Sequence, residues 1–187
     1  MQWNIPGTVL TAEHGDTPQI QERISSMFLG GGIVLSQVSA VTGLEPHTIQ
    51  NWVKRGFLAR PVGKKYTLRQ FCRILNINML KDALRMEEVL GLMTYVNGRL
   101  DDDGDDLIDD SQLYFLFLRL ARKQQMCDSR ERDEAIREIL ADYREPVPGA
   151  RERVAKALRV RHTAWAASLL CRQANAMAAE LKKETNL

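Results

Sequence analysis

The stretch that decides the fold runs from residue 35 to residue 52 and reads LSQVSAVTGLEPHTIQNW. It begins with apolar residues at the spacing of one helix face: Leu35, Val38 and Val41. This spacing predicts a short helix over about 36–41. Gly43 suits the left-handed conformation that ends a helix, and Pro46 suits the first turn of the next one. Two helices joined by so tight a turn form a helix-turn-helix.

The second helix, expected over Pro46–Arg55, has two distinct faces. Ile49, Trp52 and Val53 fall on one side at about 100° per residue, where they would anchor the helix to the core. The other side carries polar side chains at helical spacing: His47, Gln50, Asn51 and Lys54. Because Gln and Asn pair well with adenine and Lys with guanine, this face is predicted to read base edges in double-stranded DNA. An ordinary solvated helix face is the alternative.

A turn-rich segment at 57–66 follows this helix. Phe57–Arg60, a turn at Pro61–Gly63 and Lys65–Tyr66 predict a two-stranded wing. The side chains expected to contact DNA phosphates, which supply affinity rather than sequence choice, lie on the second helix, the wing and the start of the next helix: Thr48, Arg55, Arg60, Lys64, Lys65 and Arg69. Arg73, four residues after Arg69, is expected to extend this basic surface.

This part of the chain resembles the MerR-type winged helix-turn-helix proteins. The resemblance rests on three short motifs: Thr48-Ile49, Lys54-x-Gly56-Phe57-Leu58 and Tyr66-Thr67-x-x-x-Phe71. Over about 20–120, the sequence resembles still more closely an uncharacterised bacterial family that has a MerR-like head and is catalogued as a domain of unknown function. The resemblance implies DNA binding and transcription control. MerR-type proteins usually carry an arginine and an aromatic residue where Gln50 and Asn51 stand. The resemblance therefore does not imply which operator sequence the protein binds.

The rest of the chain has mainly helical periodicity, so the fold class is all-α with a small β-wing. Further helices are expected at about 18–28, 68–75, 84–96, 111–126, 129–143 and 150–183. Thr67 with Gln70, and Asp128 with Glu131, have the pattern of helix caps. The chain is expected to divide into a MerR-like head at 18–97, a helical extension with an acidic loop at 98–145, and a C-terminal helix at 150–187.

Charge is unevenly distributed along a chain whose net charge is only +2. Residues 45–85 hold nine basic and two acidic residues, whereas residues 86–150 hold eight basic and sixteen acidic ones. This segregation suits a phosphate-facing surface on a nearly neutral protein. The sequence contains no apolar run of about 18 residues and no signal-peptide pattern at its start. Its three cysteines lie far apart, which is typical of a cytoplasmic protein without a disulfide framework or zinc ribbon.

The acidic loop contains two clusters of aspartates, Asp101–Asp106 and Asp109–Asp110. An EF-hand loop counted from Asp101 would need glycine at the sixth position and glutamate at the twelfth, where Asp106 and Gln112 stand. We therefore expect no metal, and instead an exposed loop whose last acids cap the following helix. The loop could also repel DNA or meet a basic partner. The histidines are isolated and catalytic motifs are absent, so neither an enzyme nor a cofactor is expected.

The C-terminal helix carries apolar residues in one broad stripe: Val154, Leu158, Trp165, Leu169, Leu170, Met177 and Leu181. The stripe either packs against its own chain or forms a homodimer. The sequence as a whole predicts a sequence-specific DNA-binding transcriptional regulator with recognition helix 46–55 and wing 57–66. The alternatives are a protein-interaction adaptor on a winged-helix scaffold and an excisionase-like architectural DNA-binding protein.

Overall fold

The computed structural model describes residues 2–13, 17–100, 103–122 and 129–184, which are mostly helical with two small antiparallel sheets. The helices are α1 Thr17–Ser26, α2 Leu35–Thr42, α3 Pro46–Lys54, α4 Leu68–Leu80, α5 Met86–Asn97, α6 Asp110–Ala121, α7 Ser129–Ile139 and α8 Ala150–Glu184. The strands are β1 Gln2–Asn4, β2 Thr11–Glu13, β3 Ile33–Val34 and β4 Lys65–Tyr66, and a short 3-10 helix spans Asp103–Asp105. The expectation of a mainly helical chain is confirmed.

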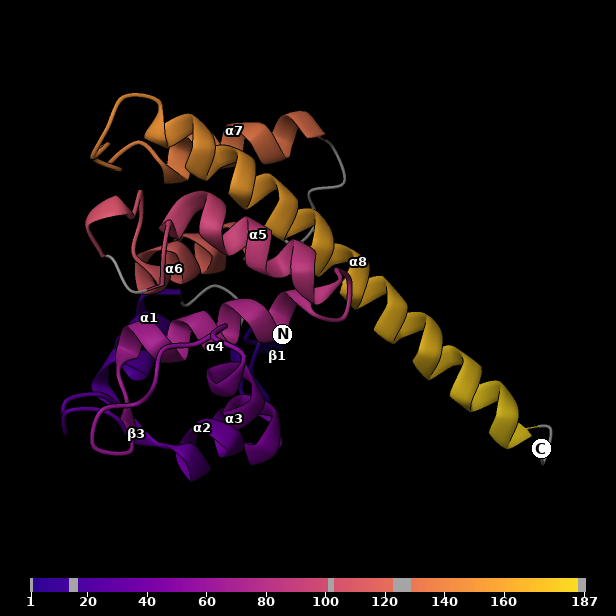
Figure 1. Cartoon of the computed structure of the whole chain (residues 1–187). Coiled ribbons are helices and arrows are strands. Elements are labelled where there is room, and N and C mark those ends of the chain that lie inside the picture. Colours follow the sequence, from indigo (N-terminus) through magenta and orange to yellow (C-terminus); the bar gives the residue numbers. More distant parts are fainter. Residues whose placement is uncertain (1, 14–16, 101–102, 123–128, 185–187) are drawn as a thin grey trace.

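Helices α2 and α3 are joined by three residues, as the local sequence predicts. Gly43 has a φ of 69°, in the left-handed region, and its N–H donates to the Ser39 carbonyl at 2.9 Å. Pro46 occupies the first turn of α3. Figure 1 shows α2 and α3 at one end of the molecule and α7 at the other.

The predicted wing has a different pairing from the one expected. Strand β4 pairs with β3, in the register Ile33 with Tyr66 and Val34 with Lys65, and not with 57–60. An isolated bridge between Val62 and Lys65 is the pairing that remains within the described segment 57–66. The expectation of a strand at Phe57–Arg60 is therefore wrong.

Side chains of α4 explain why this segment is not a strand. The Gln70 side-chain amide donates to the carbonyl oxygens of Ala59 and Arg60, at 3.2 and 3.0 Å. Arg73 Nε donates to the Phe57 carbonyl at 3.0 Å. These bonds satisfy backbone acceptors that a strand partner would otherwise occupy, so the segment is held as an irregular loop against α4.

Helix α4 lies at the centre of the fold. Its N-cap Thr67 and N3 residue Gln70 form the predicted capping box, with bonds of 3.0 and 3.2 Å. Most of its side chains are buried, and it packs against α2, α5, α6 and α8. One cluster of buried apolar side chains extends from the N-terminal hairpin through α4 to the first half of α8.

The observed helix ends agree only in part with the expected ones. Asp109 caps α6 by accepting bonds from the N–H groups of Ser111 and Gln112, as expected for the last acids of the loop. Helix α4 continues to Leu80 rather than ending near 75, and α7 ends at Ile139 rather than near 143. The cap expected at Asp128 lies outside the described residues.

Helix α8 separates into two parts, which Figure 1 shows as a segment packed on the body and a segment projecting beyond it. Val154, Leu158 and Trp165 are buried, whereas every side chain from Leu170 to Lys183 is exposed. The single stripe predicted from the sequence is thus two different surfaces. None of the helices in the described part of the chain combines the length and apolar character needed to cross a bilayer.

Candidate nucleic-acid interface

The two faces of α3 are separated as the sequence predicts. Ile49 is fully buried and Trp52 is 5% exposed, so both anchor the helix to the core. The side chains predicted to read DNA bases are all exposed: His47, Gln50, Asn51 and Lys54. None of the four side chains has a hydrogen bond or ion pair with another residue in the described part of the chain. This face therefore presents donors and acceptors to solvent without an internal competitor.

The residues predicted to contact phosphate surround this face unevenly. Thr48 is half-buried, whereas Arg55, Arg60, Lys64 and Lys65 are exposed. The Arg55 guanidinium lies over the Phe57 ring, 4.6 Å from its centroid, and Lys65 Nζ donates to the Gly30 carbonyl at 3.0 Å. These contacts hold two of the cations near the wing while leaving them accessible.

Arg69 and Arg73 have partners that the sequence does not reveal. Arg69 forms ion pairs with Asp106 at 2.5 Å and with Asp109 at 3.5 Å. Arg73 is buried and forms an ion pair with Asp110 at 3.2 Å. The expectation that Arg73 extends the basic surface is wrong, because its charge is used inside the protein. Arg69 remains partly exposed but is already neutralised by the acidic loop.

A groove separates α3 from the β3–β4 sheet. It has a volume of about 480 Å³, and its lining includes Leu35, Gln50, Lys64 and Tyr66. Gln50 and Lys64, predicted to contact a base and a phosphate respectively, thus face the same concave surface. The arrangement places one amide and one cation within reach of a single ligand.

Behind this interface lies a buried polar network. Asp110 accepts from Arg73, and its backbone carbonyl accepts from the Asn76 side chain at 3.2 Å. The Asn76 side-chain oxygen accepts in turn from Arg161 of α8, which is fully buried. Since Arg73 also donates to the Phe57 carbonyl, the network links the loop that follows α3 to α4, α6 and α8.

Burial shifts the pKa values of the charged members of this network. Desolvation lowers the pKa of Arg161 to about 10, although nearby Asp110 opposes the shift. Desolvation raises the pKa of Asp110, and the adjacent Arg73 opposes that rise. The sequence contains one signal for this network, because Arg161 falls on the buried face of α8 between Leu158 and Trp165. Its partners lie too far away in the sequence to be inferred.

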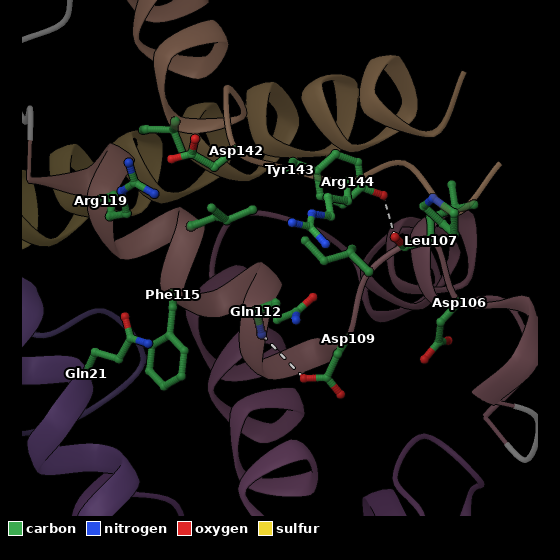
Figure 2. A pocket seen from close by; sticks show the side chains of 14 residues that line it. Gln21, Asp106, Leu107, Asp109, Gln112, Phe115, Arg119, Asp142, Tyr143 and Arg144 are labelled. Carbon is green, nitrogen blue, oxygen red and sulfur yellow. Dashed lines mark hydrogen bonds between the residues drawn. The ribbon is translucent and has the colours of Figure 1, made fainter. Parts of the chain in front are cut away.

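A second groove, shown in Figure 2, lies away from α3. It has a volume of about 610 Å³ and an apolar floor that includes Leu107, Phe115 and Ile139. Arg119 and Asp142 lie together at one end of it, while Arg144 lies near Gln112. None of its lining residues belongs to the 33–66 segment, so we assign it no part in contacting DNA. Its residues come from several segments, and no single motif predicts it.

The described residues contain no group of three His, Cys, Asp or Glu side chains placed to hold a metal ion. The described aspartates of the acidic loop have other roles: Asp105 accepts from the Arg99 N–H, and Asp106 pairs with Arg69. Asp101 and Asp102 lie outside the described residues.

Comparison with known proteins gives one match. Residues 32–117 match the family model of a domain of unknown function (DUF1836). The match begins just before β3 and ends within α6, so it includes α2, α3, β4, α4 and α5 and covers a little under half of the chain. The likeness to an uncharacterised family is therefore confirmed for this segment. No curated protein and no solved structure matches the chain.

Proposed function

We propose that the chain is a sequence-specific DNA-binding transcriptional regulator that places α3 in the major groove and the 57–66 wing on the backbone. The observation that carries this proposal is the outer face of α3. Two of its exposed side chains, Gln50 and Asn51, are amides that can bond to base edges, and the helix beneath them is fixed by Ile49 and Trp52.

The order of elements supports a MerR-like winged helix-turn-helix. Helix α2, a three-residue turn and α3 are followed by a loop, strand β4 and helix α4. Segment 45–85 also carries most of the excess positive charge, of which Arg55, Arg60 and Lys64 remain exposed. Basic side chains beside the groove would supply the salt-dependent part of binding. Such a regulator would act in the cytoplasm, and a homodimer would carry two α3 helices to two half-sites.

Substitutions on α3 and on the wing should have different effects on DNA binding. Gln50→Ala or Asn51→Ala should change sequence preference at one position of the site, by about 1–3 kcal/mol per lost bidentate contact. Lys64→Ala should weaken binding to all sequences alike and reduce the salt slope by roughly one. Affinities measured on a panel of single-base variants at several salt concentrations would separate these effects.

Arg119→Ala supplies the control, because it removes an exposed cation that lies away from α3. It should leave both the affinity and the salt slope unchanged. Equal losses on every DNA sequence for the α3 and wing variants would contradict the assignment of their roles.

The second candidate function is a protein-interaction adaptor on the same scaffold. It is favoured by the pairing of Arg69 with Asp106 and Asp109, which neutralises a cation that a DNA-binding surface would use. An adaptor would bind no DNA even at low salt. An excisionase-like architectural protein would instead bend DNA, which circular-permutation gel shifts would reveal.

A further inference from the structure

The groove shown in Figure 2 has walls that come from several separate parts of the chain. Helix α6 forms one side, and the end of α7 with the residues that follow it forms another. The loop before α6 and Gln21 of α1 complete the lining. The volume of about 610 Å³ falls within the range of small-molecule sites, which is roughly 300–1,000 Å³.

The floor of this groove is apolar. Leu107, Phe115 and Ile139 are buried core residues that line it, and Leu116 and Tyr143 are half-buried beside them. The Tyr143 hydroxyl donates to the Leu107 carbonyl, so the polar atom of this side chain already has a partner. Such a floor suits the apolar body of a ligand, because the removal of apolar surface from water favours binding.

One cation of the lining, Arg144, is available to a ligand. Its side chain is exposed and has no hydrogen bond or ion pair with another residue in the described part of the chain. Figure 2 shows it near Gln112, whose exposed side-chain amide likewise has no partner among the described residues. A guanidinium can bind both oxygens of a carboxylate at once, and the amide can donate a further bond.

The acidic residues of the lining do not pair with this arginine. Asp106 and Asp109 form ion pairs with Arg69, at 2.5 and 3.5 Å, and Asp109 also caps α6. Asp142 lies beside Arg119 at one end of the groove. Each of these carboxylates thus has a cation of its own near it, and the guanidinium of Arg144 remains for a carboxylate from outside the chain.

We propose that the groove binds a small amphipathic carboxylate, with its charged group on Arg144 and Gln112 and its apolar body on the floor. A cationic ligand would meet the charge of Arg144. A neutral one would displace water from the guanidinium without replacing the lost hydrogen bonds. Because no lining residue belongs to the 33–66 segment, the proposal does not depend on whether α3 binds DNA.

The first test compares ligand head groups by isothermal titration calorimetry of the full chain at neutral pH. Decanoate and decylammonium carry the same apolar tail and opposite charges, and acetate is the carboxylate without the tail. Decanoate should bind at least about tenfold more tightly than decylammonium, because its oxygens gain charge-assisted hydrogen bonds. Acetate should not bind measurably, because it buries almost no apolar surface.

Two outcomes of this comparison would overturn the proposal. Absence of decanoate binding would mean that the groove is not a site for amphipathic carboxylates. Equal affinities for decanoate and decylammonium would mean that the floor attracts apolar chains without regard to their charge. A groove of that kind would suit an apolar segment of a partner protein instead.

The second test asks whether the arginine holds the carboxylate. Arg144→Gln should weaken decanoate binding by about tenfold or more, because it removes the charged bidentate donor from an exposed position. Arg137→Gln is the matched control, since it removes an exposed cation of α7 that does not line this groove. Its decanoate affinity should equal that of the wild type. Equal losses in the two variants would mean only general attraction of an anion to a basic surface, and would overturn the proposal.

The third test places a charge on the floor. Leu116→Glu should weaken decanoate binding by about tenfold or more, because the tail would then meet a carboxylate. Glutamate is a good helix former and Leu116 is half-buried, so α6 should persist, which circular dichroism would check. Ala141→Glu adds the same charge at an exposed position outside the lining and should change the affinity by less than about twofold. Unchanged decanoate affinity in Leu116→Glu would place the ligand elsewhere and contradict the proposed site.

Discussion

Arg161→Ala should lower the free energy of unfolding by about 3–5 kcal/mol, the range for removing one partner from a buried charged network. The Arg161 guanidinium is fully buried and donates to the Asn76 side chain and to Met93 Sδ. Its pKa is lowered to about 10 by burial, so at neutral pH it is still charged and depends on these partners. Its loss would leave the Asn76 oxygen without this donor and deprive Asp110 of a nearby positive charge.

Urea denaturation of the full chain would measure this effect. Lys156→Ala, on the exposed side of α8, removes a cation whose ion pair with Glu152 is at the surface, and should change stability by less than about 0.5 kcal/mol. Arg161→Met, which fills much of the same volume without a charge, should cost less than Arg161→Ala. If Arg161→Ala and Lys156→Ala had equal small effects, the network would have no structural role.

Trp52→Ala should destabilise the protein by about 3–5 kcal/mol, because a large side chain is removed from a packed site. Trp52 is the larger of the two buried residues that anchor α3, and the cavity would lie directly under the predicted base-reading face. Loss of the anchor should therefore also abolish DNA binding. Thermal unfolding followed by circular dichroism would measure the change in stability.

The neighbouring residue provides the matched control. Asn51 is exposed and its side chain has no bond to another described residue, so Asn51→Ala should change stability by less than about 0.5 kcal/mol. A large destabilisation by Asn51→Ala, or a small one by Trp52→Ala, would mean that the two faces of α3 had been assigned the wrong way round.

The helix pair α2–α3 could be predicted from the sequence because its signals are local. Gly43 and Pro46 determine where one helix ends and the next begins, and the apolar spacing around Ile49 determines which face is buried. Each of these effects acts within about one turn of helix. The structure places both helices within one residue of the predicted bounds.

The pairing of the wing could not be predicted in the same way. Strand β3 has two residues and lies more than thirty positions before its partner β4. Segment 57–60 has strand-like residues, but bonds from Gln70 and Arg73 of α4 hold it in another conformation. Side-chain bonds between distant segments leave no periodic pattern in the sequence.

The ion-pair partners of the basic residues and the two surfaces of the C-terminal helix also could not be predicted from the sequence. The sequence shows that Arg69 and Arg73 are basic, but it does not show that each pairs with an acid 37 residues away, Asp106 in the acidic loop and Asp110 at the start of α6. It also merges two surfaces of α8 into one stripe, because Trp165 and Leu170 are both apolar. Only the packing of the body on one of them shows that the other is exposed.

Selection of bound fragments from total genomic DNA, with the purified full chain at two salt concentrations, tests the proposed function most directly. The proposal predicts an enriched, palindromic motif that persists at the higher salt, because base contacts add to the salt-dependent phosphate contacts. Weak binding to every fragment that is lost at the higher salt would contradict the proposal, because non-specific attraction to a basic surface is enough to produce it.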